Sequence, residues 1–509
     1  MSDIATNINS LPFELLSRIL QEATCLNLQD TPTFNYGLHG TAEVGNDVRL
    51  HRILRGHIVP DALKWRATES LRQVNRQWHD WVCLYALKDL YITRWRGSER
   101  YVLVLELVCN CRKLWLTSVS SRWLQSRTLD ALQGAPSSMS VYRDPYHSLK
   151  QILRLFQESP GLGACVHRLW FNGYNSAETV GMIFEILRHC TNLDHLTVPW
   201  TTLRYGTKED WSQLLGRGAK ECKPLSLEFL AVDLSTKKIS DPRNQHDERP
   251  LDFATVDFGR VERLKVFGNT NFMAITDEDL IAIARSAKNL KEIHITGTSS
   301  VNIDGVISLI EASHRKLRLL EHSPLSKAGF EHPDPSPAIN DQRHLCETLL
   351  ACHQLTDLSI SLPSLCEDLF SNPSSIHWRG EVQIRAGGLC PHHHPNREPE
   401  PQSKTQARFW RILDLTRSLM AVKGDHDGAE ELDIQLFVNY WIFEPRRGLV
   451  HGNIEMGQVL SEGAWPRAWW VSGKGPYGQT GLYGKDEGPY SCVSEEEFAE
   501  GLRRGWVSF

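Results

Sequence analysis

The 509-residue sequence has no uninterrupted apolar run approaching the roughly eighteen residues of a membrane-spanning helix. Its N-terminus, MSDIATNINSLPFELL, lacks the basic segment followed by an apolar segment that marks a secretory signal. The formal net charge is only −5, which provides no basic excess for binding nucleic acid. We therefore expect a protein of the cytoplasm or nucleus with no membrane or nucleic-acid partner.

The cysteine pattern gives no frame for a metal site. Only Cys109 and Cys111 lie close together, and no second pair stands at zinc-ligand spacing. Cys390 is followed by histidines at 392–394, but adjacent histidines cannot all converge on one tetrahedral ion. The sequence predicts reduced thiols, no metal and no cofactor.

Signatures of catalysis are also missing, since no nucleophile elbow, H-E-x-x-H or kinase motif occurs. The stretch GKGPYG at 473–478 satisfies G-x-G-x-x-G, but it contains a proline and follows no strand-turn-helix pattern. Lys485 precedes Asp486, where a phosphate-binding loop requires Ser or Thr. The sequence predicts a non-enzyme. An α/β hydrolase or transferase with an active-site loop at 473–488 is an alternative.

An amphipathic helix is predicted from about Leu11 to Ala23, where LPFELLSRIL aligns five apolar side chains in one stripe. Pro12 suits the first turn, because its missing N–H has no helical partner there. A helix this short is marginal alone in water. It therefore needs a partner surface, either in this chain or in another protein.

Helical spacing returns at Leu71, Val74, Trp78 and Trp81, with basic residues on the other side of the predicted helix. Between the two helices, residues 25–65 are rich in Asn, Pro and Gly and are interpreted as an insertion.

LPFELLSRIL followed by SLRQVNRQWHDWV resembles the F-box, and with its insertion it is similar to a fungal type of F-box protein. The resemblance implies that the first helix and its surroundings pack on a Skp-type adaptor, which joins the chain to a cullin scaffold. The insertion at 25–65 departs from the family pattern and leaves the docking geometry open. The residues expected to bind the adaptor are Leu11, Pro12, Leu15, Leu16, Ile19, Leu20, Leu71, Val74 and Trp78.

The middle of the chain repeats the pattern apolar-x-x-apolar-x-apolar. Helical segments at 177–190, 276–289 and 302–316 alternate with these strands, and Thr276 with Asp279 predicts a capping box. Leu317/Leu320/His322 is a weaker copy, and Leu114/Leu116 could begin the series. The full copies are Val166/Leu169/Phe171, Leu193/Leu196/Val198, Leu227/Leu230/Val232, Val261/Leu264/Val266, Leu290/Ile293/Ile295 and Leu355/Leu358/Ile360.

Residues 164–361 therefore resemble degenerate, helix-backed leucine-rich repeats. The resemblance implies an α/β fold in which an irregular solenoid forms a curved parallel sheet with outer helices. A doubly wound α/β domain, which also alternates strands and helices, is the alternative.

In a repeat solenoid, the residues between the apolar strand positions face the concave surface where partners bind. Among them, exposed aromatic side chains are expected to contribute most to binding. The predicted substrate surface comprises Arg168, Trp170, His195, Phe229, Asp233, Arg263, Lys265, Phe267, Glu292, His294 and Asp357.

Three polar, Pro-bearing stretches, at 235–250, 323–342 and 387–406, are predicted to be loops. A helix near 408–423 and a strand at LDIQLFVNYWIF follow, and the strand is expected to end the sheet. The Gly-, Trp- and Tyr-rich remainder is expected to cap it. The predicted domains are an F-box at 1–100, a solenoid at 101–384, a linker at 385–407, and a last strand and cap at 408–509.

These features predict the substrate-recognition subunit of a Skp/cullin/F-box ubiquitin ligase, which binds an unknown protein substrate. A stand-alone repeat scaffold is the alternative, and it predicts that Leu16 is buried within this chain.

Overall fold

The computed structural model describes residue 8 and residues 11–29, 68–93, 146–216, 223–231, 250–268, 273–324, 345–390, 402–424, 431–438, 441–452, 469–472 and 490–504. The chain forms two compact units, residues 1–217 and 218–509. Several sequence predictions lie outside the described residues: the Leu114/Leu116 strand, Asp233, the histidines at 392–394, most of the 25–65 insertion and the loop at 473–488.

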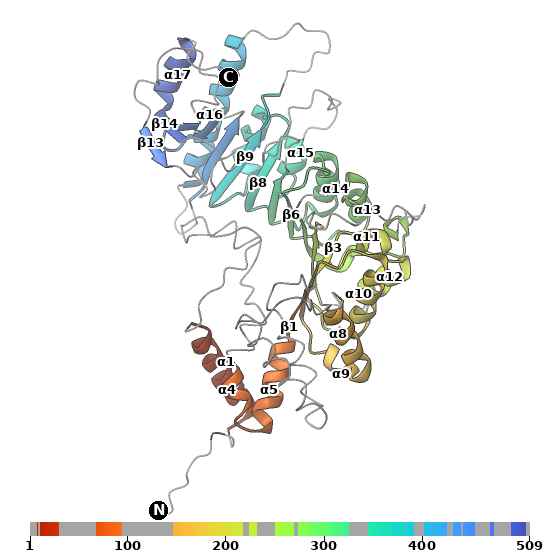
Figure 1. Ribbon diagram of the computed structural model, residues 1–509. Coiled ribbons are helices and arrows are strands. Elements are labelled where there is room, and N and C mark those ends of the chain that lie inside the picture. The colour runs from red at the N-terminus through yellow and green to blue at the C-terminus, as the bar shows by residue number, and fades with distance from the viewer. Residues whose placement is uncertain are drawn as a thin grey trace, which may run out of the picture. The chain divides into compact units, whose positions relative to one another are not determined.

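The described residues at the start of the first unit form helices α1 (Phe13–Gln29), α4 (Glu69–Arg72) and α5 (Arg76–Leu87) (Figure 1). The predicted first helix is confirmed and extends to Gln29. It turns Leu16, Leu20 and Thr24 inward, one helical turn apart, and all three are buried. The indole Nε1 of Trp81 donates a hydrogen bond of 2.9 Å to Ser17 Oγ, which ties α5 to α1.

The helix predicted around Leu71 and Trp78 is interrupted. Residues 73–75 separate α4 from α5, and Asn75 caps α5 by accepting a hydrogen bond of 2.9 Å from the Trp78 backbone N–H. An Asn side chain that satisfies a free N–H favours starting a new helix over continuing the old one. Helix α5 ends at Leu87, and the residues that follow form a strand, β1 (Asp89–Thr93).

Strands β1, β2 (Arg168–Asn172) and β3 (His195–Pro199) run parallel, in sequence order. The sheet of the first unit therefore starts within the predicted F-box domain. Helix α10 confirms the helix predicted at 177–190. Helix α8 packs on both β1 and α10. The other helices in the described residues of this unit are α8 (His147–Glu158), α9 (Pro160–Gly163), α10 (Ala177–His189), α11 (Thr202–Tyr205) and α12 (Lys208–Leu215).

The second unit contains a run of parallel strands, from β4 to β10, whose spatial order follows the sequence. A doubly wound sheet would reverse direction from a central strand, and no reversal occurs among these strands. The strands are β4 (Leu225–Leu230), β5 (Val261–Phe267), β6 (Glu292–Thr296), β7 (Leu319–Ser323), β8 (Asp357–Leu362), β9 (Glu381–Ala386) and β10 (Asp433–Val438).

The helices that connect these strands form one layer, in which each element packs on the next from α13 through α14, α15 and the 3-10 helix η5 to α16. Figure 1 shows α13, α14 and α15 together on one side of the strands. The bounds are η3 (Pro250–Asp252), η4 (Phe258–Arg260), α13 (Asp277–Ala284), α14 (Ile303–Ser313), α15 (Leu345–Leu350), η5 (Glu367–Phe370), η6 (Pro373–Ser375) and α16 (Gln402–Gly424).

Local signals explain where several elements begin and end. The predicted capping box is confirmed, since the Thr276 N–H donates a hydrogen bond of 2.9 Å to Asp279 Oδ2 at the start of α13. Strands β5 and β6 each end at a glycine with positive φ, Gly268 at 98° and Gly297 at 66°. Only glycine adopts this conformation without strain. The same type of turn therefore follows two successive strands, β5 and β6.

The C-terminal region extends the sheet. Strand β10 pairs in parallel with β9, but the single strand predicted to end the sheet is divided into β10 and an antiparallel β11 (Trp441–Glu444), and the sheet continues beyond both. Beyond β10, strands β11, β12 (Leu449–Gly452), β14 (Tyr490–Ser494) and β13 (Trp469–Ser472) add antiparallel pairs. The described parts of the predicted cap are therefore further strands, followed by α17 (Glu495–Arg503).

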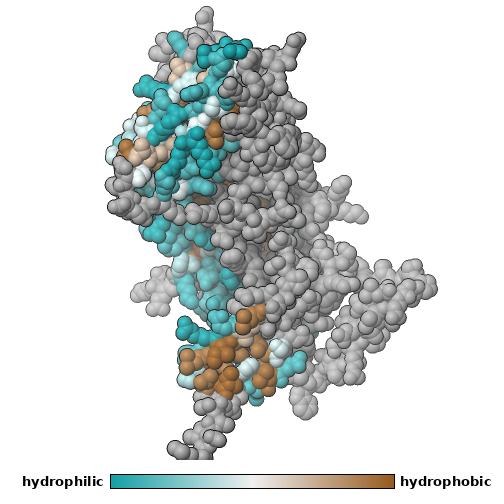
Figure 2. Space-filling model, turned by 90° about the vertical axis from the view of Figure 1, so that its left-hand side faces the viewer, coloured by the Kyte–Doolittle hydropathy of each residue, from teal (hydrophilic) through white to brown (hydrophobic). Residues whose placement is uncertain are grey.

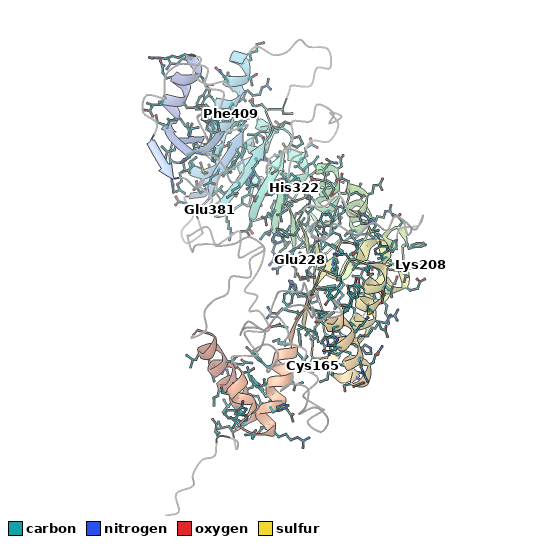
Figure 3. All side chains as sticks on the ribbon, viewed as in Figure 1. Cys165, Lys208, Glu228, His322, Glu381 and Phe409 are labelled. Carbon is teal, nitrogen blue, oxygen red and sulfur yellow. The ribbon has the colours of Figure 1, made fainter. Side chains whose placement is uncertain are left out.

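An aromatic cluster joins this extension to its helices. The rings of Phe409 on α16 and Phe443 on β11 have centroids 4.5 Å apart, and Phe498 on α17 packs on Phe443 and Trp441. Figure 3 shows where Phe409 lies in this part of the molecule.

The apolar core of the second unit follows two columns across the strands. One column contains Leu227, Leu264, Ile293, Leu320 and Leu358, and all of them are buried. Phe229 stands opposite Val266 in the second column and is 0% exposed. The predicted pattern Leu227/Leu230/Val232 therefore had the wrong register. Phe229 is a core residue, whereas Leu230 belongs to the opposite face.

His322 occupies this second column, where the neighbouring strands carry Ile295 and Ile360. Burial lowers the pKa of its imidazole to about 4, and the nearby charge of Arg385 adds to this effect, although a hydrogen bond with the Ser361 carbonyl opposes it. The folded chain therefore holds His322 neutral.

This shift predicts a loss of stability in acid. Between pH 6.5 and about 4, the unfolded chain binds more protons at His322 than the folded chain, so the free energy of unfolding falls as the pH falls. The loss attributable to this residue should reach about 3 kcal/mol. His322→Leu, which suits the apolar column, should flatten this part of the stability profile in urea titrations from pH 7 to 4. An unchanged profile would contradict the assignment.

The overall class is α/β with a mostly parallel, open sheet. No helix in the described part of the chain is both long and apolar enough to cross a membrane. The predicted linker at 385–407 overlaps the end of β9 and the start of α16. Each of the three Pro-bearing stretches follows the carboxyl end of a strand, namely β4, β7 or β9.

Candidate interaction surfaces

Helix α1 carries a second apolar stripe beside the buried one. Pro12, Leu15, Ile19 and Leu26 fall within about 60° of the helix circumference, next to the face that carries Leu16. Leu15 is 49% exposed and Ile19 is 41% exposed, whereas Leu16 is 1% exposed. The helix is therefore apolar on two adjacent faces, and among the described residues only one of these faces is buried.

The exposed stripe lies in a wider hydrophobic region. Phe13, Val74 and Leu84 are also large, apolar and exposed. Figure 2 shows a hydrophobic patch at the lower part of the molecule, where α1, α4 and α5 lie in Figure 1. A concentration of exposed apolar side chains is typical of a surface that binds another protein.

The nine residues predicted to bind an adaptor separate into two groups. Leu16, Leu20 and Leu71 are buried within the first unit, so their side chains stabilise the helices rather than face a partner. Burial of Leu16 is what the scaffold alternative predicted. The residues that remain accessible, wholly or in part, are Leu11, Pro12, Leu15, Ile19, Val74 and Trp78.

The second candidate surface is the face of the second unit's sheet opposite its core columns, here called the polar face. Its residues form three rows across the strands. The amino row is Ser226, Arg263, Glu292, Leu319, Asp357, Glu381 and Asp433; the middle row is Glu228, Lys265, His294, Glu321, Ser359, Gln383 and Gln435; the carboxyl row is Leu230, Phe267, Thr296, Ser323, Ser361, Arg385 and Phe437.

Oppositely charged or hydrogen-bonding side chains face each other across β5, β6 and β7. Arg263 and Glu292 are cross-strand partners, and Arg263 Nη2 donates to Glu292 Oε1 at 2.6 Å. Burial opposes ionisation of Glu292, but hydrogen bonds with His294 and Arg263 lower the pKa of its carboxyl to about 2. In the middle row, His294 Nδ1 lies 2.9 Å from Glu321 Oε2 on the next strand. Cross-strand pairs of this kind stabilise sheets.

Lys265 sits at the centre of this charge network. It is buried, and burial lowers the pKa of its ammonium group, while the carboxylates of Glu228, Glu292 and Glu321 oppose that shift. Five carboxylate or basic side chains surround it, namely Glu228, Arg263, Glu292, His294 and Glu321. Of these, Arg263, Glu292 and His294 were predicted from sequence as substrate contacts. Glu228 and Glu321 were not, although both lie at alternate strand positions.

The predicted surface residues of the first unit also contact one another or a neighbouring strand. Arg168 forms a bidentate ion pair with Asp89, its cross-strand neighbour on β1. The guanidinium lies 5.9 Å from the Trp170 ring, which in turn packs on His195. Trp170 is buried, so it is not the exposed aromatic contact that the sequence predicted.

Among the residues predicted for the substrate surface, the second unit brings Arg263, Lys265, Phe267, Glu292, His294 and Asp357 onto the polar face. Asp357 is exposed, Arg263, Phe267 and Glu292 are half-buried, and Lys265 and His294 are buried. Phe229 is excluded from this set by its place in the core. Arg168, Arg263 and Lys265 therefore lie beside carboxylates of this chain.

Thiols gather near the ends of β8 and β9. Leu365 and Leu389 form a parallel bridge, which makes Cys366 and Cys390 neighbours, and Cys346 on α15 affects the pKa of Cys366. The hydrogen bond with Cys346 and burial hold the pKa of the Cys366 thiol near 12, despite an opposing contribution from Cys390. Within the described residues, no group of three or more His, Cys, Asp or Glu side chains is arranged to hold a metal ion.

No protein-family model matches this chain, and no curated protein matches it. The two surfaces must therefore be interpreted from their own chemistry.

Proposed function

We propose that the chain is the substrate-recognition subunit of a Skp/cullin/F-box ubiquitin ligase. The observation that carries the proposal is the second apolar stripe of α1, with Leu15 and Ile19 exposed beside a face already buried in this chain. A helix in water gains nothing from such a stripe unless a partner covers it. The stripe belongs to the segment that resembles the F-box, in which a Skp-type adaptor is the partner.

The order of strands supports the leucine-rich-repeat part of the proposal. In the second unit, each parallel strand from β4 to β10 neighbours the next in sequence, and the connecting helices form one layer. Turn glycines recur directly after β5 and β6. This is the arrangement expected when each strand and helix is one unit of a solenoid.

The mechanism would be proximity rather than chemistry performed by this chain. The N-terminal helices would hold the ligase, while the polar face would hold a protein substrate in the cytoplasm or nucleus. Tethering both raises the effective concentration of substrate lysines near the conjugating enzyme. The transfer reaction belongs to the other subunits, so the chain itself is proposed to be non-catalytic.

The proposal is tested by co-expressing the full chain with a Skp-type adaptor and a cullin, then purifying through a tag on the adaptor. We expect the chain to co-purify with the adaptor, and the cullin to join the same complex in size-exclusion chromatography. A chain that is folded by circular dichroism but fails to co-purify would favour the stand-alone scaffold, which is supported by the burial of Leu16.

A further inference from the structure

Arg385, near the end of β9, is a charged residue of the polar face whose side chain is buried among uncharged groups. Its side chain is 7% exposed. It crosses β8, so that Nη1 donates to Ser323 Oγ at 3.0 Å and to Ser359 Oγ at 3.2 Å. Nη2 donates to Gln383 Oε1 at 2.9 Å, and the guanidinium carbon lies 5.3 Å from the Phe437 ring centroid.

All of these partners are uncharged. Arg168 and Arg263 each face a carboxylate on the neighbouring strand, whereas no ion pair to Arg385 occurs among the described residues. The nearest acidic residue of the middle row, Glu321, is paired with His294. A guanidinium that is largely removed from water without a counter-charge is costly, and an anion that joins it recovers that cost.

The same part of the sheet contains polar atoms without partners. Ser361 stands opposite Arg385 and is 1% exposed, and its hydroxyl has no hydrogen-bond partner. Thr296, opposite Ser323, also has a buried hydroxyl without a partner. The guanidinium has five N–H groups and uses no more than three of them in the hydrogen bonds above. Donors therefore remain for an oxygen ligand.

We propose that Arg385, with the hydroxyls of Ser361 and Thr296, binds a single carboxylate of a protein ligand. This choice of ligand rests on the proposed function, in which the polar face holds a protein substrate.

Charge balance selects the carboxylate. One guanidinium matches one negative charge, and carboxylate oxygens can accept two parallel hydrogen bonds from Arg. A phosphate dianion would leave an excess negative charge beside Glu321. It would also meet the acidic amino row, where Asp357 and Glu381 are exposed and Asp433 stands opposite Glu381. The same carboxylates would favour a ligand with a basic residue some distance from its carboxylate.

The test measures binding by the full chain alone, so that it does not depend on the adaptor. The melting temperature is followed with increasing sodium acetate, with sodium chloride at equal ionic strength as reference and inorganic phosphate as the competing anion. A random peptide library with free C-termini, and the same library with C-terminal amides, is then selected on immobilised chain. Loss of enrichment on amidation identifies the C-terminal carboxylate; continued enrichment of Asp or Glu identifies a side chain.

We expect acetate to stabilise the wild type beyond chloride, and Arg385→Gln to abolish that difference. Selected peptides should bind Arg385→Gln at least about tenfold more weakly. Ser361→Ala removes a hydroxyl that has no partner in the free chain, so it should weaken binding several-fold while leaving the melting temperature without ligand unchanged. Arg318→Gln, which removes an exposed charge before β7, is the matched control and should bind as the wild type does.

A stabilisation by phosphate that exceeds that by acetate in the wild type, and that Arg385→Gln abolishes, would overturn the carboxylate assignment. Equal acetate stabilisation and peptide binding in wild type and Arg385→Gln would show that the guanidinium is structural. Capture by the adaptor should be the same for both chains, so failure of this inference is distinguishable from failure of the proposed function.

Discussion

The double variant Leu15→Asp/Ile19→Asp is expected to lose capture by a Skp-type adaptor. Both side chains are exposed in the free chain, so the free energy of unfolding should change by no more than about 0.5 kcal/mol per site. In a complex, each aspartate would be desolvated against an apolar surface, at a cost of several kcal/mol. Affinity should therefore fall at least about 100-fold, as measured by biolayer interferometry with immobilised adaptor.

Gln21→Asp is the control for an added aspartate, because it places one negative charge on an exposed position of α1 away from the stripe. It should bind the adaptor as the wild type does. Leu16→Asp would be a poor test, since it charges a buried position and should unfold the N-terminal helices. Equal affinities for the double variant and the wild type would remove the stripe from the adaptor interface. An equal loss with Gln21→Asp would attribute the effect to charge alone.

The second large effect is expected in the core of the second unit. Phe229→Ala should lower the free energy of unfolding by about 3–5 kcal/mol, because it leaves a cavity where a fully buried ring packs. Phe267→Ala, on the half-buried polar face, should cost less than half as much. Both are measured by guanidinium denaturation of the full chain.

Each phenylalanine serves as the control of the other, since the two substitutions remove the same atoms from neighbouring strands. Similar midpoint shifts for the two variants would contradict the register in which Phe229 faces Val266.

The comparison of these two residues shows where pattern recognition succeeds and where it fails. On β5, VERLKVF offers one alternation of apolar positions, and the predicted register is the observed one. On β4, LSLEFLAV offers two alternations. The spacing apolar-x-x-apolar-x-apolar matches Leu227, Leu230 and Val232, so the sequence pattern favoured these residues over Leu227/Phe229. Only pairing with β5 resolves the choice, because a shift by one residue exchanges the two faces.

Arg385 was missed for a related reason. EVQIRA has valine and isoleucine at alternate positions but lacks the leucines of the repeat, and its end was assigned to a linker. Its pairing in parallel between β8 and β10 shows that it is a strand. The helices were easier to predict, because α10, α13 and α14 each have their own apolar periodicity and their boundaries carry capping residues.

The adaptor surface was predicted as a segment but not as a set of side chains. Sequence spacing places Leu15, Leu16, Ile19 and Leu20 on one broad apolar side of α1. Which of them are available depends on where Trp81 packs, and that contact spans a large sequence separation.

The connections of the second unit differ in length between the two ends of its strands. Chain segments that enter the strands are short, as between Ala284 and Glu292, whereas the longest segments leave the carboxyl ends of β4, β7 and β9. In general, doubling the length of a flexible loop costs only about 0.6 kcal/mol in closure entropy. Added length at this one edge, where the strands end, interrupts no strand pairing. Evolution or engineering can vary the contacts of that edge while the sheet beneath it stays the same.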